Sequence, residues 1–256
     1  MIKIKSSREI ELMKQAAEVV KKVFKALKPM CKSGVSTQEL DELAEKVMIE
    51  NDSKSSSKGY YGFPGAICIS VNETLVHGIP SKKIILKDGD IVSLDVVVNY
   101  KGYHADACRT YPVGIIKENA QRLIQVTKES FFEGISKVHD GAHLGDVSEA
   151  IQKYNESHGY SVSRDYTGHG IGSSMHEDPS IPNYGTAGTG PILKAGMTLA
   201  IEPMVCEGKP QTRVLGDGWT AKTKDGKLSC HYENTILVTE SVRTCIYTLY
   251  PHLFLF

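Results

Sequence analysis

Apolar residues recur at alternating steps of three and four along residues 7–28, which is the spacing of one face of an α-helix. This pattern predicts a first helix over these residues. Ser6 and Glu9 form a capping box at its start, and Pro29 ends it. The apolar face consists of Ile10, Met13, Ala17, Val20, Phe24 and Leu27.

A second helix is predicted from Ser36 to about Glu50. Ser36 and Glu39 form another capping box at its start, and apolar residues again share one face. The polar stretch NDSKSSSK at 51–58 follows this helix, and its composition predicts a loop. The apolar face of the second helix consists of Leu40, Leu43, Ala44 and Val47.

The rest of the chain mixes predicted helices with shorter extended segments. Residues 118–138 and 145–157 are predicted to be helical, and residues 90–111 to form a hairpin around residues 100–102. The remaining extended segments are 66–71, 73–80 (a strand end or a turn), 167–176, 197–205 and 229–238.

Two extended segments resemble each other at an offset of 107 residues. LKDGDIVSLDVVV at 86–98 matches LKAGMTLAIEPMV at 193–205, and the match places Asp95 on Glu202. The second predicted helix also matches a later segment at the same offset. The matching pairs are Gly34 and Gly141, Leu40 and Val147, Glu42 and Glu149, Ala44 and Ile151, and Lys46 and Lys153.

A helix and a strand that match at one common offset indicate a duplicated unit. The period is far longer than the repeats of solenoid proteins, so two halves are expected and not a repeat array. A pseudo-two-fold axis between the halves would bring Asp95 and Glu202 face to face across a shared site. Each half would then contribute one acidic residue from the same place on its strand.

Composition and charge narrow the classes of protein. The chain has 256 residues, enough for one domain with a substantial core, and its formal net charge of zero provides no general attraction for nucleic acid or an anionic membrane. Six widely spaced cysteines without a CxxC pair are typical of reduced thiols in a cytosolic protein. The first residues turn polar too early for a signal peptide, and no segment reaches the length of a membrane span, so a cytoplasmic location is expected.

The predicted hairpin contains two aspartates, Asp95 inside an apolar run and Asp106 beyond the turn. A turn at Tyr100 and Lys101 would place them directly opposite each other, with β-carbons about 5 Å apart, and a turn one residue longer would make them diagonal neighbours. Their charges would repel, and the pair could share a proton, be neutralised by Arg109, or bind a divalent cation. On these two residues alone, an exposed turn or a salt bridge is the commoner explanation.

Other residues extend this pair to a set. Glu202 and Glu233 stand in or beside apolar runs, and His169 lies among glycines in TGHGIG, which lacks the spacing of a nucleotide-binding loop. Each of them alone is more often structural than functional. Together, carboxylates and one imidazole suit a divalent transition metal such as Mn²⁺, Fe²⁺, Co²⁺ or Zn²⁺, and four carboxylates carry enough charge for two such ions.

The set resembles the metal site of methionine aminopeptidases of the bacterial type, and the resemblance covers roughly residues 5–240. It implies the pita-bread fold, an α/β (α+β) architecture in which helices cover an antiparallel sheet. One catalytic domain, 1–256, would contain two pseudo-two-fold halves at about 5–112 and 113–240. The residues that carry the resemblance are His77, Asp95 and Asp106, His169 in GHGIG, His176, Glu202 in IEP, Glu233 in HYENTILV, and GWTAKTKDGKLS at 218–229.

The resemblance also implies the ligands of two divalent metal ions, whose physiological identity (Mn, Fe, Co or Zn) the sequence leaves open. Asp95 would chelate one ion, Asp106 and Glu233 would bridge both, and His169 and Glu202 would complete the other. The implied activity is removal of the N-terminal methionine from nascent proteins and peptides, with a small second residue preferred.

In the implied reaction, a hydroxide held by the two metal ions attacks the carbonyl that follows the first methionine. Glu202 would accept and pass on the proton, in addition to binding metal. His176 would stabilise the tetrahedral oxyanion. His77 would contact the second residue of the substrate and help to carry the proton to the leaving amine.

The methionine pocket, by the same resemblance, would be lined by apolar and polarizable side chains that suit a thioether. Ser57 stands where many relatives have cysteine, Phe63 replaces a frequent tyrosine, and Met175 replaces a frequent phenylalanine. These departures leave the reaction unchanged and concern the shape of the pocket. The implied pocket residues are Tyr60, Phe63, Cys68, Met175 and Trp219.

Two other functions compete with this interpretation. One is a proline-directed peptidase of the same fold, although such relatives have a large N-terminal domain and more histidines around the metals. The other is a catalytically silent binding protein, although such relatives lose metal ligands and here all five are present. The expected partners are peptide or nascent-chain substrates, for which binding to the ribosome would be useful. A monomer is the expected state, and the apolar end of the chain at 244–256 matches nothing in the family.

Overall fold

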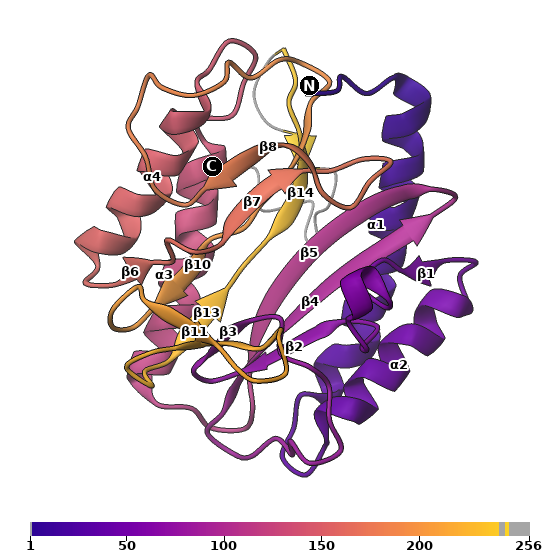
Figure 1. Ribbon diagram of the computed structural model, residues 1–256, viewed down its shortest axis with the longest axis vertical. Coiled ribbons are helices and arrows are strands. Elements are labelled where there is room, and N and C mark those ends of the chain that lie inside the picture. Colours follow the sequence, from indigo (N-terminus) through magenta and orange to yellow (C-terminus); the bar gives the residue numbers. More distant parts are fainter. Residues whose placement is uncertain (1, 241–243, 246–256) are drawn as a thin grey trace.

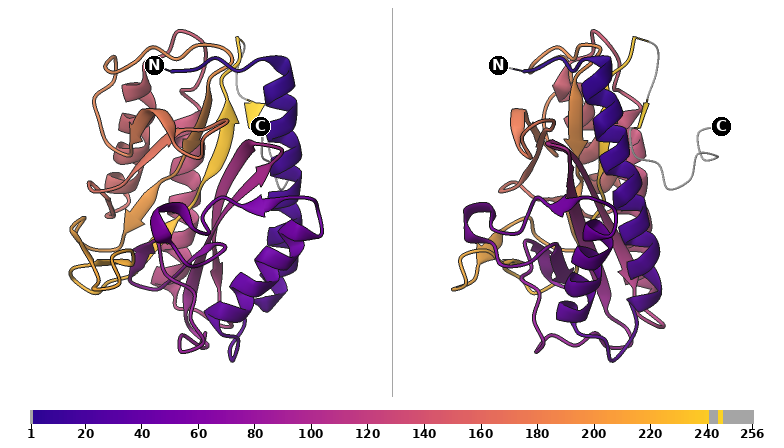
Figure 2. Two further views of the ribbon diagram at one scale, coloured as in Figure 1. Left: turned by 45° about the vertical axis from the view of Figure 1, so that its right-hand side comes forward. Right: turned by 90° about the vertical axis from the view of Figure 1, so that its right-hand side faces the viewer.

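Each pair of helices covers the strands of its own part of the chain in the computed structural model, which describes residues 2–240, 244 and 245 (Figure 1). Helices α1 (Ser7–Leu27) and α2 (Thr37–Ile49) pack on the earlier strands, and α3 (Glu118–Ile135) and α4 (Leu144–Ser157) on the later ones. Figure 2 shows all four helices on one side of the strands, with loops and short strands on the other side. The four predicted helices are therefore confirmed, with small shifts of their ends.

Both predicted capping boxes are present. The Ser6 side chain accepts the Glu9 backbone N–H at 3.4 Å, and the Glu9 carboxylate accepts the Ser6 N–H at 2.7 Å. Ser36 and Glu39 make the same exchange at 3.2 and 2.8 Å. These contacts satisfy backbone donors that the first turn of a helix leaves without partners, so they fix where each helix begins.

The central hairpin consists of β4 (Ile91–Tyr100) and β5 (Tyr103–Pro112). Its turn is formed by Lys101 and Gly102, which both have positive φ, as the primed turns of two-residue hairpins require. Tyr100 therefore pairs with Tyr103, Asp95 lies opposite Cys108, and Asp106 lies opposite Val97. The register that placed the two aspartates directly opposite each other is wrong, and the diagonal alternative is the one observed.

Short strands extend this hairpin and build the rest of the sheets. In the first sheet β4 pairs with β5, with β1 (Lys54–Ser55) and with β2 (Cys68–Val71). The longest strand order is β15-β14-β9-β7-β8, formed by Thr244–Cys245, Asn234–Leu237, Thr198–Ile201, Thr167–Gly170 and Glu177–Pro182. The two remaining orders are β13-β10-β6, formed by Ser229–His231, Met204–Cys206 and Ser161–Val162, and β11-β12-β3, formed by Thr212–Val214, Ala221–Thr223 and Thr74–Val76.

Two segments that the sequence predicts to contain strand and loop each consist of two strands with a break between them. The segment 197–205 is interrupted at Glu202 and Pro203 between β9 and β10, and 229–238 at Tyr232 and Glu233 between β13 and β14. The predicted loop at 51–58 contains the short strand β1. Strands β6, β8, β11, β12 and β15 were not predicted, because two to six residues with distant partners give little periodicity.

The offset of 107 residues recurs in the backbone. Gly34 and Gly141 have φ of 89° and 87°, and their N–H groups donate at 2.9 Å to the carbonyls of Leu86 and Leu193. The helices α2 and α4, which begin at 37 and 144, follow these glycines at the same offset. The unit that is repeated in the sequence therefore also has the same turn and helix in the structure. The exact bounds of the two halves and the assignment of one domain remain predictions.

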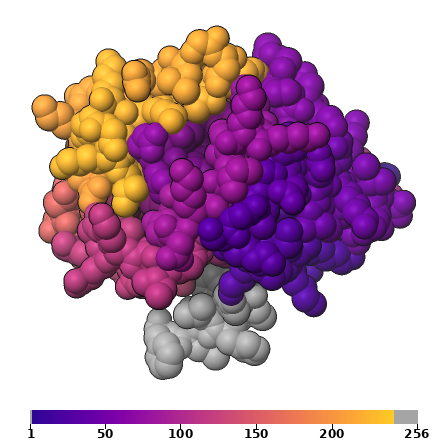
Figure 3. Space-filling model, turned by 90° about the horizontal axis from the view of Figure 1, so that it is seen from below, coloured from indigo at the N-terminus to yellow at the C-terminus, as the bar shows by residue number. Residues whose placement is uncertain are grey.

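The two parts of the chain occupy different sides of the surface. In the view of Figure 3, residues near the N-terminus (indigo and purple) lie on one side and residues of the later strands (orange and yellow) on the other. Within the described part of the chain, no helix combines the length and the apolarity that crossing a membrane requires. Residues 246–256, which include most of the apolar end of the chain, lie outside the described residues.

Candidate metal centre

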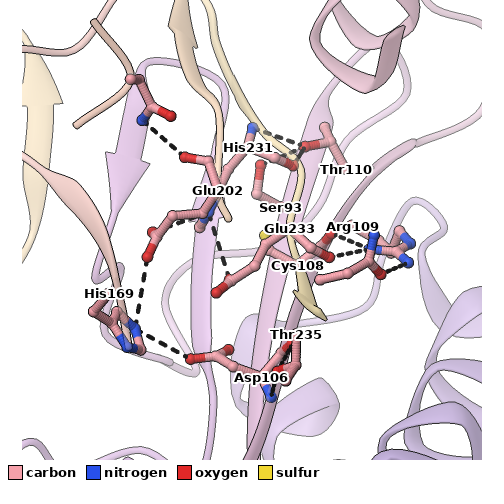
Figure 4. A network of polar contacts seen from close by, with 12 residues as sticks. Ser93, Asp106, Cys108, Arg109, Thr110, His169, Glu202, His231, Glu233 and Thr235 are labelled. Atoms are coloured by element: carbon pink, nitrogen blue, oxygen red, sulfur yellow. Dashed lines mark hydrogen bonds and ion pairs between the residues drawn. The ribbon is translucent and has the colours of Figure 1, made fainter. Parts of the chain in front are cut away.

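Five side chains that the sequence singles out as ligands line one cavity. Figure 4 shows Asp106, His169, Glu202 and Glu233 of this set. Asp95 projects from β4, Asp106 from β5 and His169 from β7. Glu202 and Glu233 stand at the two breaks between strands. Only 4% of Asp106, 9% of Glu202 and 1% of Glu233 is exposed, so the carboxylates are withdrawn from water.

Strand register explains why the two glutamates lie together. Met204 pairs with His231 on one side of the breaks, and Ile201 pairs with Asn234 on the other, so the strands stay in step across the gap. This register places Glu202 opposite Glu233. Pro203 has no N–H to donate, which interrupts the ladder where the carboxylates turn into the cavity.

The inner strands of the two parts of the chain meet beside these residues. The backbone groups of Cys108 on β5 and Glu233 exchange two N–H···O=C hydrogen bonds at 3.3 and 3.1 Å. The Thr235 hydroxyl accepts the Asp106 N–H at 2.9 Å and donates to the Asp106 carbonyl at 3.0 Å. Hydrogen bonds between the two parts of the chain therefore fix the backbones of two candidate ligands, Asp106 and Glu233, next to each other.

Arg109 does not neutralise the carboxylate cluster. Its guanidinium donates to the backbone carbonyls of Cys108 at 2.7 Å and Glu233 at 2.5 Å, and to the Asn234 side chain at 2.5 Å. Burial outweighs the arginine charge, because the pKa of the Glu233 carboxyl is still raised well above its usual range. Neutralisation of the two aspartates by Arg109, which the sequence left open, is therefore less well supported than a bound divalent cation.

Burial raises the pKa of every carboxyl in the cluster. The pKa of Asp95 rises to about 6, and those of Asp106, Glu202 and Glu233 rise well above their usual range. Burial is the largest cause, and neighbouring carboxylates raise the pKa of Asp106 and Glu233 further. Without a nearby positive charge the protonated forms of these carboxyls are favoured. A bound cation would stabilise their charged forms instead.

Several buried polar atoms of the cluster lack a hydrogen-bond partner within the described structure. They are Asp95 Oδ1, Asp106 Oδ1, Glu233 Oε1 and His231 Nε2. Such atoms are rare and costly in folded proteins unless an ion or water satisfies them. Ligand atoms of Asp106, His169 and Glu233 lie within 4.8 Å of one another, and so do those of Glu202, His231 and Glu233. Oxygen donors with one or two imidazoles at this spacing fit divalent metal ions.

His169 has the tautomer that a metal ligand needs. Its Nδ1 lies 2.8 Å from the Gly170 carbonyl, so Nδ1 carries the proton and Nε2 presents a lone pair. Nε2 lies 3.7 Å from Asp106 Oδ2 and 3.6 Å from Glu202 Oε1. Burial lowers the pKa of His169 to about 3, which keeps the imidazole neutral.

The glycines around His169 allow neighbouring strands to approach closely. A β-carbon at Gly168 would lie 2.4 Å from the Ala200 carbonyl oxygen, and one at Gly170 would lie 2.0 Å from that of Asp178. Any other residue would push β7 away from β9 or β8. The glycine-rich motif therefore packs a ligand-bearing strand between two others and cradles no phosphate.

His231 is a residue of this cluster that the sequence reasoning missed. Its Nε2 lies 3.4 Å from Glu202 Oε2 and 3.6 Å from Glu233 Oε2. The available signal was the alternation of side chains along an extended segment, which places His231 and Glu233 on the same face. The break at Tyr232 and Glu233 leaves this alternation intact.

Two further predicted histidines line the same cavity. His176 Nδ1 lies 2.8 Å from the Tyr60 hydroxyl, and its ring centroid is 4.3 Å from that of His169. His77 has a positive φ of 57° and meets the rings of Tyr166 and Trp219 edge to face. Burial lowers the pKa of both histidines, that of His77 to about 4, so both are neutral at neutral pH.

The cavity has a volume of about 790 Å³ and an apolar side next to the carboxylates. Phe63 and Trp219 meet edge to face with centroids 5.2 Å apart, and Cys68 on β2 pairs with Asp95 on β4. All five predicted pocket residues line this cavity, as does Ser57; they are Tyr60, Phe63, Cys68, Met175 and Trp219.

A buried ion pair holds the loop that carries Met175 and His176. Lys5 Nζ lies 2.8 Å from Glu177 Oε2, with side chains that are 3% and 6% exposed. Glu177 Oε1 also accepts the Ser174 N–H at 3.1 Å. The sequence reasoning missed Lys5, because no local pattern links it to a residue 172 positions later.

Comparisons with known proteins agree with this geometry. The profile of metallopeptidase family M24 matches residues 11–240. A methionine aminopeptidase of Clostridium perfringens is 50% identical over 238 residues, which cover 93% of this chain and 95% of that protein. The crystal structure of methionine aminopeptidase from Thermotoga maritima is 46% identical with a TM-score of 0.95, and the match covers 96% of this chain and 99% of that chain.

A more distant structure shares the fold. The prolidase of Pyrococcus furiosus is 23% identical with a TM-score of 0.78, and the match covers 96% of this chain but 65% of that chain. The two structural matches confirm the predicted α/β pita-bread fold, in which helices cover antiparallel strands.

Proposed function

The chain belongs to metallopeptidase family M24, and from its site we propose that it is a metal-dependent aminopeptidase that removes N-terminal methionine from proteins and peptides. The observation that carries this proposal is the buried cluster of four carboxylates and His169, whose unpartnered atoms face a cavity with an apolar side. A substrate with a free amino terminus and an apolar first side chain fits such a cavity.

Two divalent ions are the cofactor in this proposal, held by Asp95, Asp106, His169, Glu202 and Glu233. When bound, such ions supply a Lewis acid and lower the pKa of a water molecule to near neutrality. The cluster is mostly oxygen, which suits Mn²⁺, Fe²⁺, Co²⁺ or Zn²⁺, and availability in the cell selects among them.

Glu202 is the proton carrier of the reaction in this proposal. Its Oε1 lies 3.6 Å from His169 Nε2 and its Oε2 lies 3.4 Å from His231 Nε2, so the carboxylate stands between two neutral imidazoles. Burial raises the pKa of Glu202 well above its usual range, which makes the carboxylate a stronger base at neutral pH.

His176 stabilises the oxyanion that forms at the scissile carbonyl. The Tyr60 hydroxyl lies 2.8 Å from Nδ1. In this proposal the hydroxyl donates to Nδ1, so the proton of the imidazole is on Nε2, the nitrogen that can donate a hydrogen bond into the cavity. A neutral donor fixed in advance stabilises developing negative charge without reorganisation. His77, between Tyr166 and Trp219, contacts the second residue of the substrate and relays the proton to the leaving amine.

The apolar side of the cavity receives the methionine side chain. Phe63, Cys68, Met175 and Trp219 offer soft, polarizable surface to a thioether. Ser57, Phe63 and Met175 change the shape of this pocket relative to the commoner family pattern. A small second residue in the substrate is preferred in this proposal, because His77 and Trp219 line the cavity with ring centroids 6.0 Å apart and leave little room beside them.

The proposed setting is the cytoplasm, with the protein acting as a monomer on nascent chains near the ribosome. The five described cysteines are all free, which agrees with a reducing compartment.

The decisive experiment is a metal-dependent peptide assay. Metal-free protein is supplied anaerobically with Fe²⁺ or Mn²⁺ and given the peptide Met-Ala-Ser, and released methionine is measured with and without a chelator. Release that the chelator abolishes supports the proposal. Cleavage confined to X-Pro peptides would show a proline-directed peptidase, and no turnover with any divalent metal would show a binding protein.

A further inference from the structure

His231 occupies a symmetric counterpart of a proposed metal ligand. On β5, Asp106 pairs with Val97 of β4, and on β13, His231 pairs with Met204 of β10, which stands 107 residues after Val97. The repeat therefore places an imidazole where the first part of the chain has a bridging carboxylate. The inference that follows rests on the metal centre of the proposed function.

The hydroxyls of two threonines fix these counterparts in the same way. The Thr110 hydroxyl donates to the His231 carbonyl at 2.9 Å and accepts the His231 N–H at 3.2 Å. The Thr235 hydroxyl makes the same two contacts with Asp106. A threonine hydroxyl therefore fixes the backbone of each residue in the same way. The His231 side chain points into the carboxylate cluster, as the Asp106 side chain does (Figure 4).

The surroundings of His231 distinguish it from His169. His169 donates through Nδ1 to a backbone carbonyl, as metal-binding histidines almost always do, and so keeps a free lone pair on Nε2. In His231 it is Nε2 that is buried, and within the described structure this atom has no partner in good hydrogen-bond geometry. The groups that face its Nε2 are carboxylate oxygens of Glu202 and Glu233, at 3.4 and 3.6 Å.

Two acceptors on one side select the tautomer with the proton on Nε2. An N–H on Nε2 is attracted by both carboxylates, whereas a lone pair there would face four oxygen lone pairs. The imidazole is 2% exposed, so water does not screen this preference. With its proton on Nε2, His231 has no lone pair to give to a metal ion in that direction.

We propose that His231 is a positioning residue of the metal centre, whose Nε2–H faces Glu202 and Glu233 and holds the two carboxylates side by side in their metal-binding orientation. Register places these glutamates opposite each other, where like charges repel. A neutral donor behind both of them reduces this repulsion. It also keeps Glu202 Oε1 turned toward His169.

The test compares two substitutions that differ in one property. His231→Gln keeps an N–H donor of similar reach, and His231→Leu keeps bulk but has no donor. Cobalt(II) affinity of the metal-free proteins is measured by calorimetry, and imidazoles per cobalt are counted by X-ray absorption. Met204→Leu is the matched control, because Met204 pairs with His231 and lines the same cavity, but neither Met nor Leu at this position can donate a hydrogen bond.

We expect His231→Leu to bind Co²⁺ about 10- to 100-fold more weakly, the usual effect of losing a partner of a metal ligand. His231→Gln and Met204→Leu should bind as the wild type does, and the imidazole count should be the same in all four proteins. Methionine release should fall in His231→Leu and be restored in His231→Gln.

Two results would overturn the inference. If His231→Gln is as weak as His231→Leu and the imidazole count falls by one, His231 is a direct metal ligand. If His231→Leu binds Co²⁺ like the wild type, His231 has no role in the centre. If the leucine variant does not fold, His231→Asn replaces it, because its short amide cannot reach the glutamates. A wild-type protein that binds no divalent metal would refute the proposed function itself, independently of His231.

Discussion

Four carboxyl groups in one buried cluster are the feature that shapes this protein at the scale of single residues. Ordinary folding excludes such a group of like charges, since burial of an unpaired charge is costly. Burial raises the pKa of Asp95, Asp106, Glu202 and Glu233, because it disfavours the charged form of each carboxyl. The cluster is therefore kept for the positive charge that it binds.

The metal-free protein should lose stability as pH rises. Above about pH 8 the histidines are neutral in the folded and unfolded states alike, so the buried histidines with lowered pKa no longer contribute to the pH dependence. The buried carboxyls have raised pKa values when folded, so the native state binds more protons than the unfolded state. The free energy of unfolding then falls with increasing pH.

Denaturant unfolding in chelator at about pH 8 and about pH 9 measures this difference, and the same pair of experiments with Mn²⁺ is the control. We expect a lower midpoint at the higher pH in chelator and a smaller change with metal. If the unfolding midpoint changes equally with pH in chelator and in Mn²⁺, the prediction is contradicted.

Glu202→Gln should nearly abolish methionine release while the protein still folds. The amide keeps the shape of the side chain but cannot accept a proton from the attacking water, and loss of a general base lowers kcat by about 10²–10⁴-fold. Peptide turnover at matched metal content, together with circular dichroism, measures the effect. Turnover close to the wild type would remove Glu202 from the proton transfer.

At the scale of elements, β5 and β14 join the two parts of the chain through backbone and threonine contacts. The Cys108 and Glu233 backbones exchange hydrogen bonds, and Thr235 binds both backbone groups of Asp106. This pairing brings Asp106 and Glu233 into the same buried cluster.

Thr235→Val should destabilise the fold, because the buried Asp106 N–H loses its acceptor. Leaving such a donor without a partner costs about 1–3 kcal/mol. Chemical denaturation measures the loss. Thr167→Val is the control, since the Thr167 hydroxyl bonds Ser180 at an exposed position and its removal should have little effect. Equal effects of the two substitutions would argue against this role of Thr235.

The N-terminal segment acts on the site through the loop 172–177. Lys5→Met keeps the length of the side chain but leaves Glu177 buried without its cation, which costs about 3–5 kcal/mol in other proteins. We expect reduced stability and a fall in kcat/KM, because the loop carries Met175 and His176. Denaturation and peptide kinetics measure the two effects.

Lys3→Met is the matched control for this experiment. Lys3 Nζ also faces Glu177, at 3.8 Å, but its side chain is 59% exposed. Removal of such an exposed charge should change stability by less than about 0.5 kcal/mol. If Lys5→Met is as mild as Lys3→Met, the buried ion pair does not hold the loop.

At the scale of the whole molecule, the ligands come from both parts of the chain, so bound metal should stabilise the entire fold. Asp95 and Asp106 belong to the first part, and His169, Glu202 and Glu233 to the second. A ligand that binds only the folded state stabilises it by about 2.7 kcal/mol at a concentration one hundred times its Kd. Removal of metal should therefore lower the unfolding midpoint.

Denaturation of one preparation with chelator, with Mn²⁺ and with Mg²⁺ measures this effect. Mg²⁺ is the control, because it retains its water shell and prefers oxygen to imidazole. We expect Mn²⁺ to raise the midpoint more than Mg²⁺ does. Identical midpoints in chelator and in Mn²⁺ would mean that the cluster does not bridge the two parts of the chain.

The sequence alone determined the helices, the duplication and the identity of the five ligand candidates. Helix periodicity and the capping boxes at Ser6 and Ser36 are local signals, so they predict the helices without knowledge of the fold. The match between 86–98 and 193–205 carried the duplication, and its offset recurs in the turns at Gly34 and Gly141. The motifs around His169 and Glu202 carried the resemblance to the family.

The tertiary structure alone decided how these residues face one another. It placed Asp95 and Asp106 on a diagonal, because the two turn residues with positive φ are Lys101 and Gly102, and not Tyr100 and Lys101. It brought His231 behind Glu202 and tied Lys5 to Glu177, contacts that join segments far apart in the chain. Local sequence patterns report spacing along one segment, whereas pairing across segments depends on register and packing of the whole fold.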